Sequence, residues 1–296
     1  MLPFGVEQTP YALAIRAGRH PASTVLAMVT DINSKNPALK SSTSKEALSE
    51  LMNDETIDMQ ERVASNPSIP VEVLTRLAKD KDAEVRKAVA KNPSVPKEVL
   101  AELASDKDVY VRVLATNNPS TPKYVLAELA SKPSTSTEVL VELAKNKSTL
   151  VRRHVASNTS TPKEVFAKLA KDKRPLVRRH VALNPSTPEE VLAKLANDEE
   201  KGVRWCVASN TSTPVEVFAE LANDAVAFVR KAVAGNPSIP VAVLTELANG
   251  SDIHVRRHVA LNPSTPKEVL DLLANDGNEG VRWRVTLNPS APRRLR

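Results

Sequence analysis

Basic, histidine and tryptophan side chains recur at fixed intervals in this chain, and these residue types can bind phosphate or stack on planar rings. The triplet Arg-Arg-His occurs at 152–154, 178–180 and 256–258, and two further copies carry Trp205 and Trp283 in its second place. Arginine forks bind phosphate oxygens in pairs, and tryptophan stacks on nucleobases. This pattern favours recognition of a polyanion over covalent chemistry.

The sequence has no grouping that is typical of an active site. Outside the repeated pattern there is no nucleophile with a neighbouring base, no glycine-rich phosphate loop and no carboxylate pair. Cys206 is the single cysteine, which excludes an internal disulfide or a cysteine-ligated cluster. His254 and His258 are spaced as half of a metal site, but no third ligand is apparent. We therefore expect a non-enzymatic protein without cofactor or metal.

These residues belong to an internal repeat. Each repeat follows the pattern V-R-x-x-V-A-x-N-P-S-T-P-x-E-V-L-x-x-L-A-x-D, and its asparagine recurs every 26 residues except for one interval of 40. The asparagines are Asn66, Asn92, Asn118, Asn158, Asn184, Asn210, Asn236, Asn262 and Asn288.

Two helices are expected in each repeat. Helix A starts at the proline before x-E-V-L, and its apolar residues have helical spacing. In Thr161-Pro162-Lys163-Glu164, threonine is expected to cap the helix, with proline in the first position and glutamate completing a capping box. Helix B, V-R-x-x-V-A-x-N, covers about two turns and is expected to be a short α-helix or a 3₁₀ segment.

A single repeat buries too few apolar side chains to fold alone, so stability must come from stacking on its neighbours. With only 7 glycines and 3% aromatic residues, the composition favours closely packed helices. The sequence thus predicts an all-α fold, an α-solenoid of about ten repeats over residues 40–296. An atypical capping segment is expected at 1–39, and a degenerate repeat without helix B near 131–137.

With this motif written out, the chain resembles the leucine-rich repeat variant family and, more distantly, HEAT and AlkD-type repeats. The resemblance covers about residues 40–292 and implies a right-handed superhelix of alternating α and 3₁₀ helices. One relative of this type carries an N-terminal iron-sulfur cluster held by cysteines, which this chain lacks. The resemblance specifies the fold and hardly constrains the function.

The arginine after the first valine of helix B recurs in nearly every repeat. Such arginines can bind the aspartates that end helix A, which would make a structural ladder between repeats, or they can contact a ligand. The arginines are Arg86, Arg112, Arg152, Arg178, Arg204, Arg230, Arg256 and Arg282, and the aspartates are Asp80, Asp106, Asp172, Asp198, Asp224 and Asp276.

The next two positions vary and carry the candidate binding residues. Helix B is basic there, whereas helix A is acidic, so a basic concave face is expected on the helix B side. Duplicated sequence without function would give the same pattern, and Trp205 and Trp283 could cover the edge of the core. The candidates are Lys87, Arg153, His154, Arg179, His180, Trp205, Lys231, Arg257, His258, Trp283 and Arg284.

This face predicts a partner of nucleic acid, DNA or RNA, or another polyanion, with a protein-protein interaction scaffold as the alternative. The formal net charge of +6 is modest for 296 residues, so its distribution matters more than its size. Helices pack about 8 to 10 Å apart while base pairs rise about 3.4 Å, which favours phosphate tracking or an extended single strand over a base code. No stretch of 18 apolar residues is present, so no membrane association and a cytoplasmic location are expected.

Overall fold

The computed structural model describes residues 57–67 and 69–295, and within these ranges the chain is built only of helices and loops. The all-α prediction is therefore confirmed, as is the regular alternation of two helices in a repeat solenoid. The expected capping segment at 1–39 lies outside the described residues, and the right-handed sense of the coil stays a prediction. The chain divides into an N-terminal unit, residues 1–121, and a C-terminal unit, residues 122–296.

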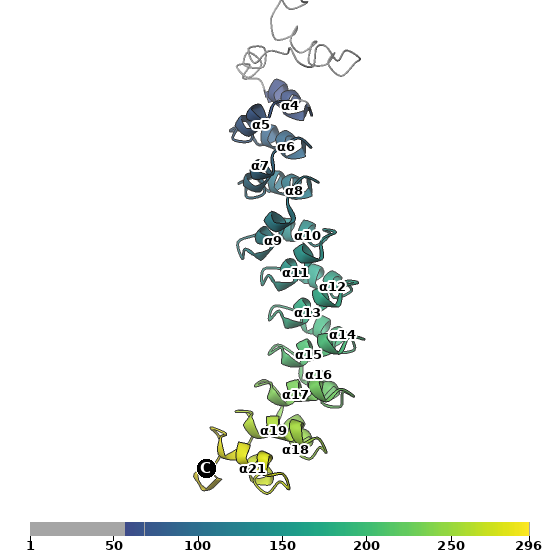
Figure 1. Cartoon of the computed structure of the whole chain (residues 1–296), viewed down its shortest axis with the longest axis vertical. Coiled ribbons are helices and arrows are strands. Elements are labelled where there is room, and N and C mark those ends of the chain that lie inside the picture. The colour runs from purple at the N-terminus through teal and green to yellow at the C-terminus, as the bar shows by residue number, and fades with distance from the viewer. Residues whose placement is uncertain (1–56, 68, 296) are drawn as a thin grey trace, which may run out of the picture. The chain divides into compact units, whose positions relative to one another are not determined.

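In the N-terminal unit the helices form two rows (Figure 1). Row B, made of the helices that follow the V-R-x-x-V-A pattern, contains α4 (Ile57–Ser65), α6 (Ala83–Lys91) and α8 (Val109–Asn117). Row A contains α5 (Val71–Leu77) and α7 (Lys97–Leu103). Within row B, α6 packs against both α4 and α8.

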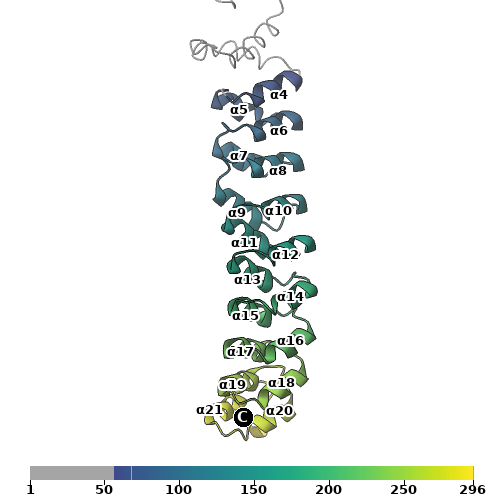
Figure 2. The same cartoon turned by 90° about the vertical axis from the view of Figure 1, so that its right-hand side faces the viewer.

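The C-terminal unit is likewise built of two rows of helices (Figures 1 and 2). Successive row B helices pack closely side by side, whereas row A helices contact one another less, so row B lies on the inner side of the unit's curve. Row B contains α9 (Lys123–Ser131), α11 (Thr149–Ser157), α13 (Pro175–Leu183), α15 (Lys201–Ser209), α17 (Ala227–Gly235), α19 (Ile253–Leu261) and α21 (Glu279–Thr286). Row A contains α10 (Thr137–Leu143), α12 (Lys163–Leu169), α14 (Glu189–Leu195), α16 (Val215–Ala222), α18 (Val241–Ala248) and α20 (Lys267–Leu273), and a final 3₁₀ turn, η2, spans Arg293–Leu295.

Helix B is an α-helix, so the 3₁₀ alternative for the second helix is wrong. In α13 it has 9 residues, two more than the 7 of helix A in α14. Its buried residues, Val177, Arg178, Val181 and Ala182, recur at the spacing of an α-helical face and pack between the neighbouring helices. This continuous buried face stabilises regular α geometry over two and a half turns.

Helix A begins differently from the prediction, because the capping box does not form. In α12 the N-cap residue is Pro162, and no side chain caps the helix. Thr161 is buried, and its hydroxyl donates to the carbonyl oxygen of Val155, six residues earlier, at 2.6 Å. The threonine thus ties the loop back to the end of helix B, which leaves Glu164 exposed without a capping role.

The core lies between the two rows. Helix A contributes a valine, a large apolar residue and a leucine, such as Val165, Phe166 and Leu169 in α12. Helix B contributes two valines and an alanine, such as Val151, Val155 and Ala156 in α11. All six are buried, which explains why the apolar pattern is retained from repeat to repeat.

The repeated asparagine links each repeat to the one before it. The side-chain nitrogen of Asn184 donates to the backbone oxygens of Ala156 and Asn158 at 2.9 and 3.0 Å, while its side-chain oxygen accepts from the N–H of Ser186 at 2.9 Å. These bonds satisfy buried carbonyl groups at the end of the previous helix B. The same pattern is made by Asn92, Asn118, Asn158, Asn210, Asn236, Asn262 and Asn288.

Helix α9 stands where the sequence suggests a helix A followed by a missing helix B. In the structure it packs beside α11 in row B. The backbone oxygens of Ala130 and Lys132 accept from Asn158 at 2.8 and 3.0 Å, as the end of a helix B does elsewhere. Within the stretch 131–137, residues 132–136 accordingly form the loop that joins α9 in row B to α10 in row A.

Candidate functional site

The first arginine of helix B forms ion pairs with the next repeat, and these pairs together make a structural ladder along the chain. The Nε and Nη2 atoms of Arg178 donate to both carboxylate oxygens of Asp198 at 2.6 and 2.8 Å, and Nη1 donates to the carbonyl of Asp172 at 2.8 Å. The two side chains are less than a tenth exposed. This arginine therefore joins its own loop to the next repeat and is not available to a ligand. Comparable pairs join Arg86 to Asp106, Arg152 to Asp172, Arg204 to Asp224, Arg230 to Asp252 and Arg256 to Asp276.

The ladder also shifts the titration of its carboxylates. Burial raises the pKa of Asp172, but hydrogen bonds from the Arg152 side chain and the Arg174 N–H, together with the arginine charges, outweigh burial. The pKa of Asp172 is therefore held below its ordinary value. The same direction holds for Asp106, Asp224, Asp252 and Asp276.

The residue directly after the ladder arginine, here called the second position, is in several repeats a cation that the ladder does not use. The residue after it is called the third position. In the described part of the chain, no ion pair joins an aspartate or glutamate to Arg153, Arg179, Lys231 or Arg257. Lys87, in the N-terminal unit, differs because its ammonium group binds Glu84 at 2.7 Å. The four unpaired cations all belong to row B of the C-terminal unit.

These second-position side chains lie against the first turn of the next row B helix, 23 residues further on. Trp205 stacks on Phe228 with ring centroids 5.3 Å apart and an interplanar angle of 10°. The Lys87 ammonium lies 5.0 Å from the centre of the Tyr110 ring. The second-position side chain, a ring or a cation, thus packs on an aromatic ring of the next repeat.

Where the second-position residue is arginine, a glycine can take the place of the ring. A Cβ on Gly202 would lie 3.4 Å from Nε of Arg179, and a Cβ on Gly280 would lie 2.8 Å from Cζ of Arg257. The guanidinium groups therefore cover bare backbone. Sequence reasoning missed these pairs, although the glycine or aromatic residue 23 positions later was a visible signal.

The third position places histidines beside the preceding repeat. Ser131 donates its hydroxyl to the carbonyl of Ala127 at 2.8 Å, so its oxygen accepts from Nδ1 of His154 at 2.8 Å. Ser157 and His180 form the same 2.8 Å bond. These bonds place the proton of each neutral imidazole on Nδ1.

Burial and nearby arginines lower the pKa of both histidines. For His154, burial is the larger cause and the charge of Arg153 adds to it. For His180, burial acts together with the charges of Arg153, His154 and Arg179. The structure thus brings these four predicted residues into one cationic cluster on α11 and α13.

His258 has a different arrangement because Gly235 offers no hydroxyl. Its Nδ1 donates to the carbonyl of His254 four residues earlier, at 2.7 Å. No group of three or more metal-ligating side chains occurs among the described residues, so His254 and His258 gain no third ligand here.

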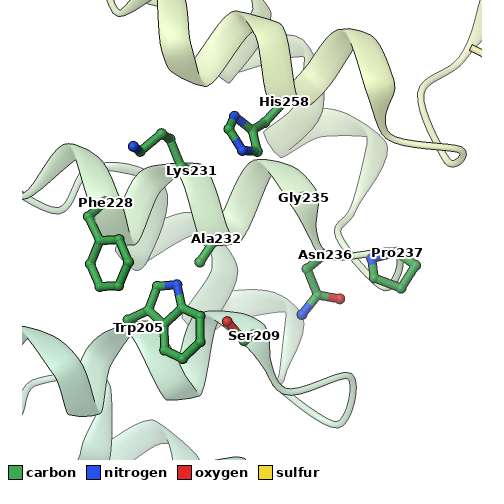
Figure 3. Close-up of a pocket in the computed structure, with 9 residues that line it drawn as sticks. All are labelled: Trp205, Ser209, Phe228, Lys231, Ala232, Gly235, Asn236, Pro237 and His258. Atoms are coloured by element: carbon green, nitrogen blue, oxygen red, sulfur yellow. The ribbon is translucent and has the colours of Figure 1, made fainter. Parts of the chain in front are cut away.

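An open groove lies on row B between α15, α17 and α19 (Figure 3). It has a volume of about 450 Å³. Three predicted residues meet here: Trp205, Lys231 and His258. Trp283, 58% exposed, and Arg284 lie further along on α21 and do not line the groove. The remaining lining residues are Ser209, Phe228, Ala232, Gly235, Asn236 and Pro237.

Three segments, 83–108, 175–200 and 253–278, match the family model described as leucine rich repeat variant. Each matched segment runs from the start of helix B through helix A into the following loop. In these three segments the chain is similar to leucine-rich repeat variants. The repeats supply the two-row framework, while the two residues after the ladder arginine of helix B differ from one repeat to the next.

Among solved structures, the chain is similar to a leucine-rich repeat variant with a novel repetitive structural motif, at 28% identity over 71% of this chain and 78% of the other, with a TM-score of 0.39. An engineered protein matches at 20% identity over 90% and 89% of the two chains, with a TM-score of 0.32. A designed armadillo repeat protein in complex with the peptide (KR)4 matches at 16% identity over 88% and 95%, with a TM-score of 0.15. No curated protein gives a match. Each described helix is too short or too polar to serve as a membrane span.

Proposed function

We propose that this repeat solenoid is a binding scaffold, and that row B of its C-terminal unit binds an extended polyanion, with single-stranded nucleic acid as the best-fitting class. The observation that carries the proposal is a set of cations that have no carboxylate partner among the residues the structure describes: Arg153, Arg179, Lys231 and Arg257. Cations that are not neutralised within the protein attract phosphate and release its counterions on binding.

The arrangement of the cations suits a chain-like ligand. They occupy one register of helix B in repeats that stack in sequence, so their charges follow the row. The stacked Trp205 and Phe228 add a surface for bases. Since the separation of packed helices exceeds the rise of a base pair, each repeat would span two or more nucleotides rather than one base.

The test compares two triple variants of equal charge change. One replaces Arg153, Arg179 and Arg257 with alanine. The other replaces Lys163, Lys168 and Lys267, which are exposed on row A helices of the same unit. Fluorescence anisotropy with labelled single-stranded DNA, single-stranded RNA and duplex DNA at several salt concentrations measures affinity for each.

Loss of the row B cations should weaken single-strand binding at least tenfold and reduce the slope of log affinity against log salt by about 2, because roughly 0.7 counterions are released per phosphate contact. The row A variant should retain most of its affinity. Absence of binding at about 50 mM salt, or equal losses in the two variants, would overturn the proposal.

A protein-interaction scaffold is the second candidate, and one feature of row A favours it. Val215 and Val241, in the first turn of α16 and α18, are 59% and 55% exposed. Exposed apolar residues in register are typical of surfaces that contact proteins. Recovery of a specific protein that depends on these valines, with no nucleic-acid binding, would support this candidate instead.

A further inference from the structure

The groove between α15, α17 and α19 exists because two side chains are small. Ala232 and Gly235 stand where α13 carries His180 and Leu183, and where α19 carries His258 and Leu261. Their small size opens about 450 Å³ on a row that larger side chains cover in the repeats of α13 and α19. That volume lies in the range of sites for small organic ligands.

One wall of the groove is aromatic. Trp205 from α15 and Phe228 from α17 stack almost parallel, and Phe228 keeps 44% of its surface exposed. Such a pair, held outside the core, presents a flat apolar surface at the edge of an open site (Figure 3). Planar heterocycles bind to surfaces of this kind by stacking.

Lys231 and His258 lie on the opposite side of the groove from Trp205 and Ser209 (Figure 3). Because His258 donates from Nδ1 to a backbone carbonyl, its Nε2 is the ring nitrogen left to contact a ligand. An ammonium group and an imidazole on one side suit an anionic group such as phosphate.

Ser209 supplies a polar group near the aromatic wall. At this position in α11, the hydroxyl of Ser157 binds His180 of the next repeat. Ser209 has no such histidine partner in the described structure, because Ala232 occupies the corresponding place. Its hydroxyl can therefore hydrogen-bond the edge of a ring. Asn236 cannot do so freely, since its side chain bonds Ala208, Asn210 and Ser238.

We infer that this groove binds one nucleotide, with its base against Trp205 and Phe228 and its phosphate beside Lys231 and His258. The inference rests on the proposed function in so far as the nucleotide belongs to a bound strand. A free mononucleotide presents the same ring and the same phosphate, so the experiment includes both sources.

The fluorescence of Trp205 can be used to follow binding in the groove. The chain has 2 tryptophans, so Trp283→Phe leaves Trp205 as the single indole. In this background, Trp205 fluorescence is followed while AMP or a short single-stranded oligonucleotide is added, and strand affinity is measured in parallel by anisotropy. Quenching of Trp205 that saturates with binding is the expected result.

Gly235→Leu fills the groove with the residue that α13 and α19 carry at this place. A Cβ at Gly235 would lie 3.8 Å from Cδ2 of His258, an ordinary contact, so the helix can accept it. The variant should abolish the quenching and weaken strand binding about tenfold, the loss expected from one stacked base. Asn117→Leu, the same register in α8 of the N-terminal unit, is the matched control and should change neither.

The outcomes separate the two proposals. Strand binding without any change in Trp205 fluorescence overturns the nucleotide site and leaves the proposed function standing. Quenching by AMP that Gly235→Leu abolishes, in a protein that binds no strand, supports the site and overturns the proposed function. If neither AMP nor the strand has any effect, both proposals fall.

Discussion

Arg178 and Asp198 form a two-point ion pair between consecutive repeats, with nitrogen–oxygen distances of 2.6 and 2.8 Å. Because Asp198 also accepts from the N–H of Glu200 at 2.9 Å, the carboxylate orders the loop before α15 as well. The pair therefore connects the two repeats through both a side chain and a loop. Its burial makes it costly to break from one side only.

Asp198→Ala should lower the free energy of unfolding by about 3 kcal/mol, because Arg178 would be left buried without its counter-charge. The control is Asp271→Ala, which removes an ion pair whose side chains are 68% and 41% exposed, and should cost less than about 1 kcal/mol. Urea denaturation followed by circular dichroism measures both. Equal losses would contradict a structural role for the ladder.

Asn210→Ala should cost about 2 to 3 kcal/mol, since it removes the side-chain donor to the buried carbonyl of Ala182 and one of the two donors to the carbonyl of Asn184. Asn223→Ala is a suitable comparison, because Asn223 is exposed and its loss leaves no buried group unpaired. Thermal unfolding of the two variants should differ by several degrees. A stability unchanged by Asn210→Ala would show that water replaces the asparagine at little cost.

Stability should fall as the solution becomes acidic. The ladder aspartates have pKa values below the ordinary 3.8, so their contribution is complete above that value and is lost as pH falls through the lower folded-state pKa. The lowered pKa values of His154 and His180 act in the same direction, beginning below their ordinary 6.5. Melting temperatures between about pH 8 and 2 should thus decline in two stages, and His154→Gln with His180→Gln should remove much of the first.

If row B binds phosphate, single-strand affinity should rise as pH falls from about 8 to 6. Burial and neighbouring arginines lower the pKa of His180 in the free protein, and a bound phosphate would raise it, so binding takes up a proton. Anisotropy titrations across this range measure the effect. The paired glutamine variant at His154 and His180 should flatten the dependence, whereas an unchanged slope would place the phosphate elsewhere.

The repeat, the two-helix plan and the ladder arginines follow from the sequence because each depends on periodicity. A valine or arginine that returns every 26 residues must meet the same neighbour in each repeat, and Arg178 does meet the aspartate of the next one. The core residues of helix A, such as Phe166, follow from apolar spacing alone. Because the repeats stack in order, a residue type that recurs at the repeat interval makes the same contact in each repeat.

Periodicity does not predict where a side chain points or which neighbour a helix packs against. A Thr-Pro sequence before a helix usually indicates a cap, yet Thr161 turns back to bond Val155 because the loop is buried between helices. The place of α9 in row B also depends on which neighbour it packs against, and its sequence resembles helix A. Pairs such as Trp205 and Phe228 lie 23 residues apart, so they are found only by comparing positions at that spacing and not at the 26-residue period.

The repeated asparagine donates to main-chain oxygens, so its acceptors do not depend on which side chains the preceding repeat carries. Lys132 illustrates this, because its carbonyl accepts from Asn158 although lysine stands in the asparagine position. A repeat that keeps its own asparagine can therefore dock on almost any predecessor. Gene segments encoding such repeats could be inserted, lost or shuffled while the junctions still formed, which gives this architecture a route to new lengths and new surface combinations.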